Sequence, residues 1–319
     1  MTPSILKPAL YGLLGILLVL GVVRALFPDH PNPVRLSTHV WPGYELLGLA
    51  LDTRLADPSD FVISRQENAL GSMNAIRRGD VDAATLTLDE VLSLRAEGAD
   101  LRVIHVIDVS HGADAVVARE AWTPGEDLRG KRIAVEDQQV GGLMLDSLLR
   151  ASNLSRSDVT IISVDDVTIQ QWNDNIDVLI TYEPIVSALE QRGAHKIFDS
   201  AEIPFEIVDV LVASKEAIES NPDGLTKLVE GYLAGRAAWI NKPMDSQYRL
   251  AKHLSLHSEQ IAPIFAGLLL PEARYVAQLL GGSSSDMQGV CELLRKRQEL
   301  PKAVCSDVFT ADLLPSLTL

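Results

Sequence analysis

Two successive sets of short apolar segments, each alternating with amphipathic segments of helical period, constrain the fold of this chain more than any other feature. The expected strands of the first set cover residues 34–38, 61–63, 81–86 and 101–107. The expected strands of the second set cover residues 115–118, 132–135, 159–164, 176–181 and 208–212. Because strands that alternate with helices through short loops build α/β domains with largely parallel sheets, the sequence predicts an α/β fold.

The order of these segments also predicts two lobes. Residues from Pro222 onward are nearly all helical in pattern, so two α/β sets precede a helical C-terminal segment. The strands 115–118 and 208–212 flank the second set, and we expect the chain to cross between lobes beside them. The predicted lobe 1 comprises residues 34–113 and 209–319, and lobe 2 comprises residues 114–208. Ligands of such sheets bind beyond the carboxyl ends of the strands.

The N-terminal residues 1–33 differ from the rest. Residues 9–23 carry no charge, Lys7 precedes them, Arg24 follows, and a Pro-rich linker ends at Pro33. The run is short for a membrane span, which needs about 20 residues. Val23-Arg24-Ala25 is a poor cleavage site, and there is no lipobox cysteine. We favour an uncleaved signal anchor, a hydrophobic transmembrane helix; a cleaved signal and a buried globular helix are the alternatives. Either kind of export segment places the remainder on the periplasmic side of the inner membrane.

Charge and cysteine content exclude other classes. The formal net charge is −15, which disfavours binding to nucleic acid. Cys291 and Cys305 are the two cysteines, and no Cys/His cluster has metal-ligand spacing, so we expect no metal and no cofactor. The two cysteines either pair in a disulfide or remain separate buried thiols.

Four motifs follow one another along the chain. They are Trp41-Pro42-Gly43-Tyr44-Glu45, residues 75–83 (AIRRGDVDA), residues 127–135 (DLRGKRIAV) and residues 175–184 (NIDVLITYEP). This series resembles the solute-binding proteins of nitrate/sulfonate/taurine-type ABC importers, which include relatives that bind thiamine-pyrimidine precursors. Residues 88–90 and 108–114 are similar to a subgroup of that family. The resemblance covers most of the chain, from Val34 to Leu313.

The resemblance implies a type II periplasmic-binding fold, hinge closure on a small ligand, and delivery to an ABC permease. We expect a monomer that is not an enzyme, since neither a G-x-S-x-G nor an H-E-x-x-H motif is present. A membrane anchor in place of the family's cleaved signal or lipid anchor leaves one alternative, a tethered sensor that signals to a membrane partner. A second alternative is an enzyme on the same fold, with Glu183 or His111 as acid–base.

Candidate ligand-binding residues of the first set follow its strands. Trp41 and Tyr44 could form an aromatic platform, or Trp41 could simply pack lobe 1. Ser72, near a helix start, suits an anionic group or is a plain first-turn serine. Thr87, Asp89 and Glu90 face the cleft, or Thr87 and Glu90 form a capping box.

The crossings and the second set supply the other candidates. Asp108, Ser110 and His111 follow the strand 101–107, although His111 could be a solvated loop residue. Val140 and Gly141 precede a helix whose N–H groups are free. Glu183 ends the strand 176–181, with a role at the helix N-terminus as its alternative, and Asp209 either binds ligand or bonds to hinge backbone.

The candidate carboxylates are Asp89, Glu90, Asp108, Glu183 and Asp209, and the predicted cleft loops hold no Lys or Arg. Clustered buried carboxylates are costly without a cation. The sequence therefore favours an amine-bearing or heteroaromatic ligand, with stacking from Trp41 or Tyr44.

Overall fold

The computed structural model describes residues 32–122, 128–137, 139–165, 167–281 and 285–315. The predicted signal anchor lies outside these residues. Within them, every helix is too short or too polar to cross a bilayer. Residues 33–319 form one compact unit.

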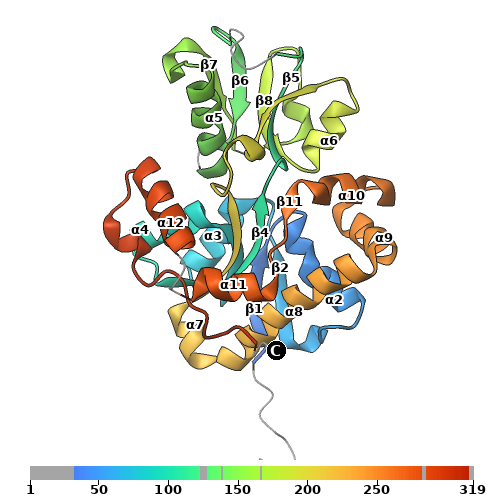
Figure 1. The fold of residues 1–319 in the computed structure, drawn as a ribbon, viewed down its shortest axis with the longest axis vertical. Helices are drawn as coiled ribbons and strands as arrows, with labels where there is room; N and C mark the ends of the chain where they lie inside the picture. Colours follow the sequence, from blue (N-terminus) through green and yellow to red (C-terminus); the bar gives the residue numbers. More distant parts are fainter. Residues whose placement is uncertain (1–31, 123–127, 138, 166, 282–284, 316–319) are drawn as a thin grey trace, which may run out of the picture. The chain divides into compact units, whose positions relative to one another are not determined.

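A six-stranded sheet forms the centre of lobe 1 (Figure 1). Its strands, in spatial order, are β11 (Leu268–Leu269), β4 (Leu101–Ser110), β10 (Val208–Ser214), β3 (Ala83–Thr87), β1 (Val34–Thr38) and β2 (Phe61–Arg65). β1 is parallel to β2 and β3, whereas β10 is antiparallel to both β3 and β4. The returning strand β10 therefore lies between two strands of the first set.

A five-stranded sheet forms the centre of lobe 2. Its strands, in spatial order, are β7 (Thr160–Ser163), β6 (Arg132–Val135), β8 (Val178–Tyr182), β5 (Asp114–Ala118) and β9 (His195–Asp199). The sequence did not predict β9, because this edge strand is half exposed and lacks an apolar alternation. The chain leaves the larger sheet after Ser110 and returns at Val208. The predicted lobe limits lie at these crossings and, as domain boundaries, stay a prediction.

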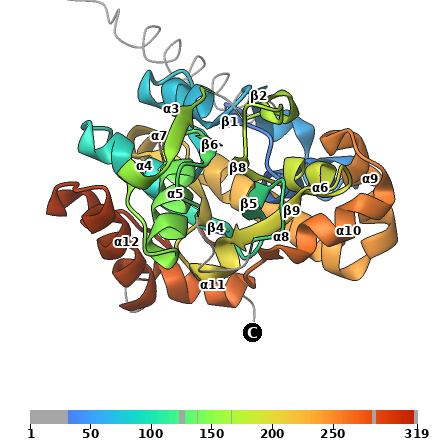
Figure 2. The ribbon, with the colours of Figure 1, turned by 90° about the horizontal axis from the view of Figure 1, so that it is seen from above.

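Helices cover both faces of each sheet, so each lobe has two cores (Figure 2). One face of the larger sheet packs against α2 (Leu46–Asp52), α8 (Pro222–Asn241), α9 (Pro243–Leu254) and α10 (Ser258–Ala266). Its other face packs against α3 (Ala69–Arg77), α4 (Leu88–Ala96), α11 (Ala273–Leu280) and α12 (Ser285–Arg297).

In lobe 2, α5 (Gln139–Ala151) and α6 (Ile185–Glu190) cover opposite faces. A further short helix, α7 (Lys215–Ser220), follows β10. The predicted two-lobed α/β architecture with a helical C-terminal segment is confirmed.

The two cysteines are joined in a disulfide, which settles the alternative that the sequence left open. Cys291 and Cys305 have their Cα atoms 5.9 Å apart, and the bond links α12 to the short helical turn Lys302–Cys305. The bond therefore holds the C-terminal segment against the core of lobe 1 that contains both residues.

Candidate ligand-binding site

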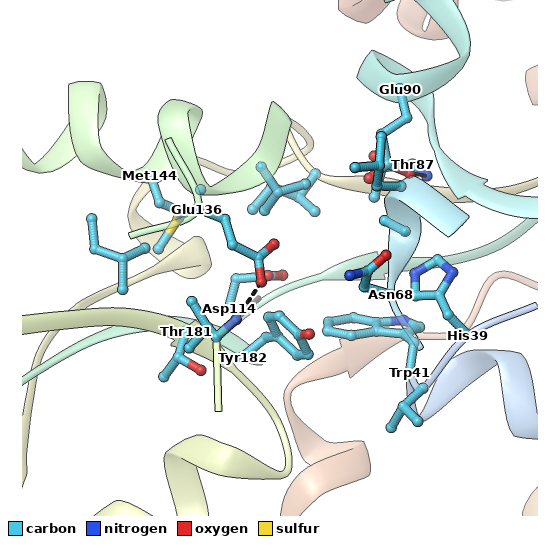
Figure 3. A pocket seen from close by; sticks show the side chains of 18 of the residues that line it. His39, Trp41, Asn68, Thr87, Glu90, Asp114, Glu136, Met144, Thr181 and Tyr182 are labelled. Carbon is cyan, nitrogen blue, oxygen red and sulfur yellow. Dashed lines mark hydrogen bonds between the residues drawn. The ribbon is translucent and has the colours of Figure 1, made fainter. Parts of the chain in front are cut away.

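A cavity of about 480 Å³ opens between the strand ends of the two lobes (Figure 3). Lobe 1 lines it mainly from the loop after β1 and from the starts of α3 and α4, and lobe 2 lines it from β8 and from the segments after β6 and β7. The lining residues are His39, Val40, Trp41, Tyr44, Asn68, Ala69, Leu70, Thr87, Glu90, Asp114, Glu136, Asp137, Val140, Gly141, Met144, Ser163, Val164, Asp165, Val167, Ile180, Thr181, Tyr182, Ile207 and Asp209.

The aromatic residues of the first loop are held by carboxylates behind them. Trp41 and Tyr44 are both buried, and the Tyr44 N–H donates to the Trp41 carbonyl at 3.1 Å, which closes a tight turn. The Trp41 Nε1–H donates to Asp108 Oδ2 at 3.1 Å, and the Tyr44 hydroxyl donates to Asp209 Oδ1 at 2.6 Å. These hydrogen bonds fix both rings at the cavity wall.

The strand register explains why those carboxylates lie together. Asp209 on β10 is opposite Asp108 on β4 and opposite Thr87 on β3. Residues directly opposite in antiparallel strands project from the same face of the sheet. The three side chains therefore form a row at the edge of the larger sheet that faces lobe 2.

Glu90 has both of the roles that the sequence offered. Its Oε2 accepts the Thr87 N–H at 2.9 Å, which completes the capping box of α4, and its side chain also lines the cavity. Burial and the neighbouring Asp89 raise the pKa of Glu90 to about 8. The helix cap therefore places a carboxyl group with raised pKa at the ligand side of lobe 1.

Lobe 2 contributes a second wall of acidic and aromatic groups. Glu136 Oε1 accepts the Val167 N–H at 2.6 Å, and Asp137 accepts two hydrogen bonds from Arg156, each 2.8 Å long. The Tyr182 ring meets the Trp41 ring edge to face with centroids 6.2 Å apart, so this pair spans the two lobes (Figure 3).

The ionisable side chains that line the cavity are nearly all acidic, and one of them, Asp137, is paired with Arg156, which lies outside the lining. Six carboxyl groups line it, and among the described lining residues there is no Lys or Arg. They belong to Glu90, Asp114, Glu136, Asp137, Asp165 and Asp209. The one lining imidazole, that of His39, has its pKa lowered to about 4 by burial, so it is neutral near pH 7. The described part of the chain holds no group of three or more metal-ligating side chains placed to bind a metal.

Two of these carboxyls are poorly satisfied. Asp114 and Asp209 are both buried, and their Oδ2 atoms accept no hydrogen bond from an N–H or hydroxyl group of the described residues, although Asp209 lies within hydrogen-bond reach of the Asp108 carboxyl. Burial raises the pKa of Asp114 to about 7, and burial together with Asp108 raises the pKa of Asp209 well above its usual range. Buried acceptors without donors are destabilising, and such atoms at a cavity wall point to a missing partner.

Seven of the thirteen candidate residues line the cavity. They are Trp41, Tyr44, Thr87, Glu90, Val140, Gly141 and Asp209. Gly141 lies where α5 begins, and a Cβ there would come within 2.0 Å of the Glu136 carbonyl oxygen, so no other residue fits this turn. The role of these residues in ligand binding remains a prediction.

The other six lie outside the lining. Asp108 is behind Trp41, and Ser72 is behind His39, whose Nδ1 lies 3.2 Å from the Ser72 Oγ. Asp89 is buried beneath the start of α4, and His111 is exposed.

Ser110 and Glu183 have partners elsewhere. The Ser110 hydroxyl lies 2.8 Å from that of Ser200, and Glu183 accepts hydrogen bonds from both the Ser187 N–H and its hydroxyl. Glu183 therefore has the helix N-terminal role that was its alternative, at α6.

Several lining residues escaped the sequence reasoning. Asp114 is the first residue of β5 and pairs in register with Tyr182, the last residue of β8. A lone acidic residue at the start of an apolar strand was the available signal, and it is the same signal that drew attention to Asp209. No comparable signal marks His39, Asn68 or Asp165.

Gly43→Ala tests how the aromatic wall is supported. A Cβ at Gly43 would come within 1.8 Å of Asp108 Oδ2, so the carboxylate must move and Trp41 loses its acceptor. Overpacking of this kind costs about 1–3 kcal/mol. We expect a melting temperature lower by several degrees and weaker ligand binding. The control is Gly289→Ala in α12, where a Cβ meets no atom within 4 Å. Equal melting temperatures for the two variants would contradict this account.

Comparisons with known proteins agree with the fold. The model of the NMT1/THI5-like family matches residues 60–246. The taurine-binding periplasmic protein of Escherichia coli K12 is 22% identical over 248 residues, which cover 74% of this chain and 77% of the relative.

Solved structures share the whole architecture. The periplasmic aliphatic sulphonate-binding protein SsuA of Escherichia coli has a TM-score of 0.68 at 19% identity and covers 88% of this chain and 92% of its own. The zinc-bound ligand-binding component of an ABC-type import system of Staphylococcus aureus has a TM-score of 0.70 at 12% identity. The match covers 90% of this chain and 99% of the other.

The fold and the cleft between its lobes are those of the type II periplasmic-binding fold, which these solved structures share. The chain belongs to the NMT1/THI5-like family. The resemblance on which the sequence prediction rested is confirmed.

Proposed function

We propose that this protein is an extracytoplasmic solute-binding protein that captures a small amine-bearing or heteroaromatic ligand. The lobes close on the ligand, and the protein delivers it to an ABC importer. The observation that carries the ligand class is the cavity lined by six carboxyl groups without a lysine or arginine among the described residues. The N-terminal segment would hold the protein on the periplasmic side of the membrane, beside its permease.

Electrostatics favours a cation in this cavity. A buried carboxylate is stable only with a cation or several hydrogen-bond donors, and a cationic ligand supplies both. An anionic headgroup such as a sulfonate or nitrate would instead meet carboxylates in a site of low dielectric constant.

The aromatic wall suits the rest of such a ligand. Trp41 and Tyr182 offer two aromatic rings within one cavity, and Tyr44 lies beside them. Flat apolar groups and cations both bind favourably to aromatic faces. A small heteroaromatic or arylalkyl molecule with a basic nitrogen would place its nitrogen against the carboxyl groups and its ring against the aromatic side chains.

A thermal-shift screen of the full-length protein in detergent tests this function. The screen compares amines with sulfonates and nitrate at equal ionic strength. We expect amines, and aromatic amines most strongly, to raise the melting temperature, because a ligand that binds only the folded state stabilises it. Stabilisation by sulfonates or nitrate with none by amines would contradict the proposed ligand class, and an absence of stabilisation by any small solute would contradict solute binding itself.

A further inference from the structure

The wall of the cavity near the two crossings between lobes has an unusual pair of side chains. Asp114 begins β5, directly after the chain passes into lobe 2, and Asp209 lies on β10, directly after the chain returns to lobe 1. Both line the cavity and both are at least 96% buried.

Each of these carboxyl groups has a buried Oδ2 atom that accepts no hydrogen bond from an N–H or hydroxyl group of the described residues. The Tyr44 hydroxyl donates to Asp209 Oδ1, and Asp209 also lies within hydrogen-bond reach of the Asp108 carboxyl. At Asp114, the backbone N–H donates to the Ser110 Oγ, and that hydroxyl lies beside the carboxyl group. Because both aspartates line the cavity, the pair places two such oxygens in its wall.

We propose that Asp114 and Asp209 form a subsite for an ammonium group that carries N–H bonds, such as a primary or secondary amine or an amidine-like nitrogen. This inference rests on the proposed solute-binding function. A quaternary ammonium has charge but no donor, so it would leave both Oδ2 atoms unsatisfied. An ammonium with at least two N–H bonds satisfies both at once, and its hydrogen bonds are charge-assisted.

The same subsite would couple ligand binding to lobe closure. Asp114 belongs to the smaller sheet and Asp209 to the larger one. One ammonium bound to both carboxylates would tie the first strand of lobe 2 to the returning strand of lobe 1. A ligand shifts the equilibrium between open and closed lobes only to the extent that such an interaction is stronger in the closed state.

Binding at this subsite would also release protons. The charged groups that face Asp209 are Asp108 and Asp114, and those that face Asp114 include Asp89 and Glu183; all are acidic. Tyr44 is the remaining titratable group against Asp209, and its own pKa is raised well above its usual value by burial. Without a cation, this acidic environment favours the protonated forms of Asp114 and Asp209. Binding of an ammonium group would favour their ionised forms, so the carboxyl groups would release protons to solvent.

Isothermal titration calorimetry on the full-length protein in detergent, with three benzyl probes, tests the subsite. Benzylamine carries charge and N–H bonds, benzyltrimethylammonium carries charge alone, and benzyl alcohol is neutral. We expect benzylamine to bind at least about tenfold more tightly than the other two, because hydrogen bonds to charged groups contribute about 1.5–3 kcal/mol each. The same titration at pH 7 is repeated in two buffers of different ionisation enthalpy, because the difference in heat reports the number of protons released. We expect net proton release when benzylamine binds.

Substitution tests the residues themselves. Asp114→Asn should weaken benzylamine at least about tenfold and reduce the proton release. Asp223→Asn makes the same chemical substitution at an exposed acid at the start of α8 and should leave both unchanged. If Asp114→Asn fails to fold, the probe order and the proton count of the unmodified protein still decide the matter.

The outcomes separate the subsite from the function. Equal affinity for benzylamine and benzyltrimethylammonium, or benzylamine binding unchanged in Asp114→Asn, would overturn the subsite. A protein that binds taurine or another solute in the cavity but not benzylamine keeps the proposed function and loses the subsite. A protein that binds no probe and no solute loses both.

Discussion

Asp209→Asn is expected to weaken an amine ligand by about 100-fold while it stabilises the free protein above pH 7. The affinity falls because truncating one partner of a buried, hydrogen-bonded charge pair costs about 2–5 kcal/mol. Each tenfold change in affinity corresponds to about 1.4 kcal/mol. The stability of the free protein rises because Asp209 is buried beside Asp108 and Asp114, with no cation among the described residues near it. An asparagine retains an oxygen for the Tyr44 hydroxyl and carries no charge to desolvate.

Calorimetric titration with benzylamine and thermal unfolding at pH 8.5 measure the two effects on the same samples. The control is again Asp223→Asn, which removes one negative charge from the surface. Binding that falls together with stability would mean that Asp209 is needed mainly for the fold. That result, or unchanged affinity, would remove Asp209 from the account of ligand binding.

The free protein should lose stability as the pH rises from 6.5 to 8.5. Burial raises the pKa of Asp108 and Asp114 to about 7 each and that of Glu90 to about 8, against about 4 in the unfolded chain. Between those values the folded state binds more protons than the unfolded state, so stability falls as pH rises. We expect a drop of about 5 °C in melting temperature, given about 1.5 °C per kcal/mol when the entropy of unfolding is scaled to a chain of 319 residues.

The histidines also titrate, so the stability measurement needs a pH range and a control variant that separate their effect from that of the carboxyl groups. Burial lowers the pKa of His39 to about 4 and that of His105 to about 3, so these two residues make stability rise with pH only below their unfolded value of about 6.5. His253, whose pKa is raised by Glu45, acts in the same direction as the carboxyls. Glu90→Gln retains His253 and should flatten the slope above pH 7. A slope as steep in Glu90→Gln as in the unmodified protein would assign the effect to other groups.

A cationic ligand should reverse this trend. Its affinity should rise with pH through the range 6.5–8.5, because fewer protons then have to leave the cavity. The stabilisation by benzylamine, measured as the shift in melting temperature at fixed concentration, is accordingly expected to be larger at pH 8.5 than at pH 6.5. A shift that is constant or that shrinks with pH would contradict proton exchange at the site.

The sequence predicted the architecture because its signals are local. Strand alternation, helical period and the glycines at the ends of segments all act within a few residues of one another. The order of the segments added the two lobes, and the ordered motifs added the family. The half-exposed edge strand β9 was missed because its residues, His195–Asp199, show no apolar alternation.

The site was harder to predict because the direction of a side chain depends on distant partners. Asp114 and Glu183 both lie near strand ends, yet Asp114 lines the cavity whereas Glu183 turns to the Ser187 N–H at the start of α6. Asp108 seemed equivalent to Asp209, but the indole of Trp41 lies between it and the ligand space. Such differences arise from strand register and from loop packing, which no local pattern encodes.

The acidic character of the cleft was predictable even where its members were not. Glu90 and Asp209 were predicted, whereas the predicted Asp89, Asp108 and Glu183 lie outside the lining and four other acids line it: Asp114, Glu136, Asp137 and Asp165. The absence of lysine and arginine from the predicted cleft loops holds for the described cavity lining as well. Composition of the loops was thus a better guide to the charge of the cavity lining than the choice of any single residue.

Native mass spectrometry of the full-length protein, purified without added ligand, tests the central claim most directly. The account predicts a co-purified small molecule with a basic nitrogen, bound one per chain and lost in Asp209→Asn. A co-purified sulfonate or other anion without a basic nitrogen, retained in Asp209→Asn, would contradict it.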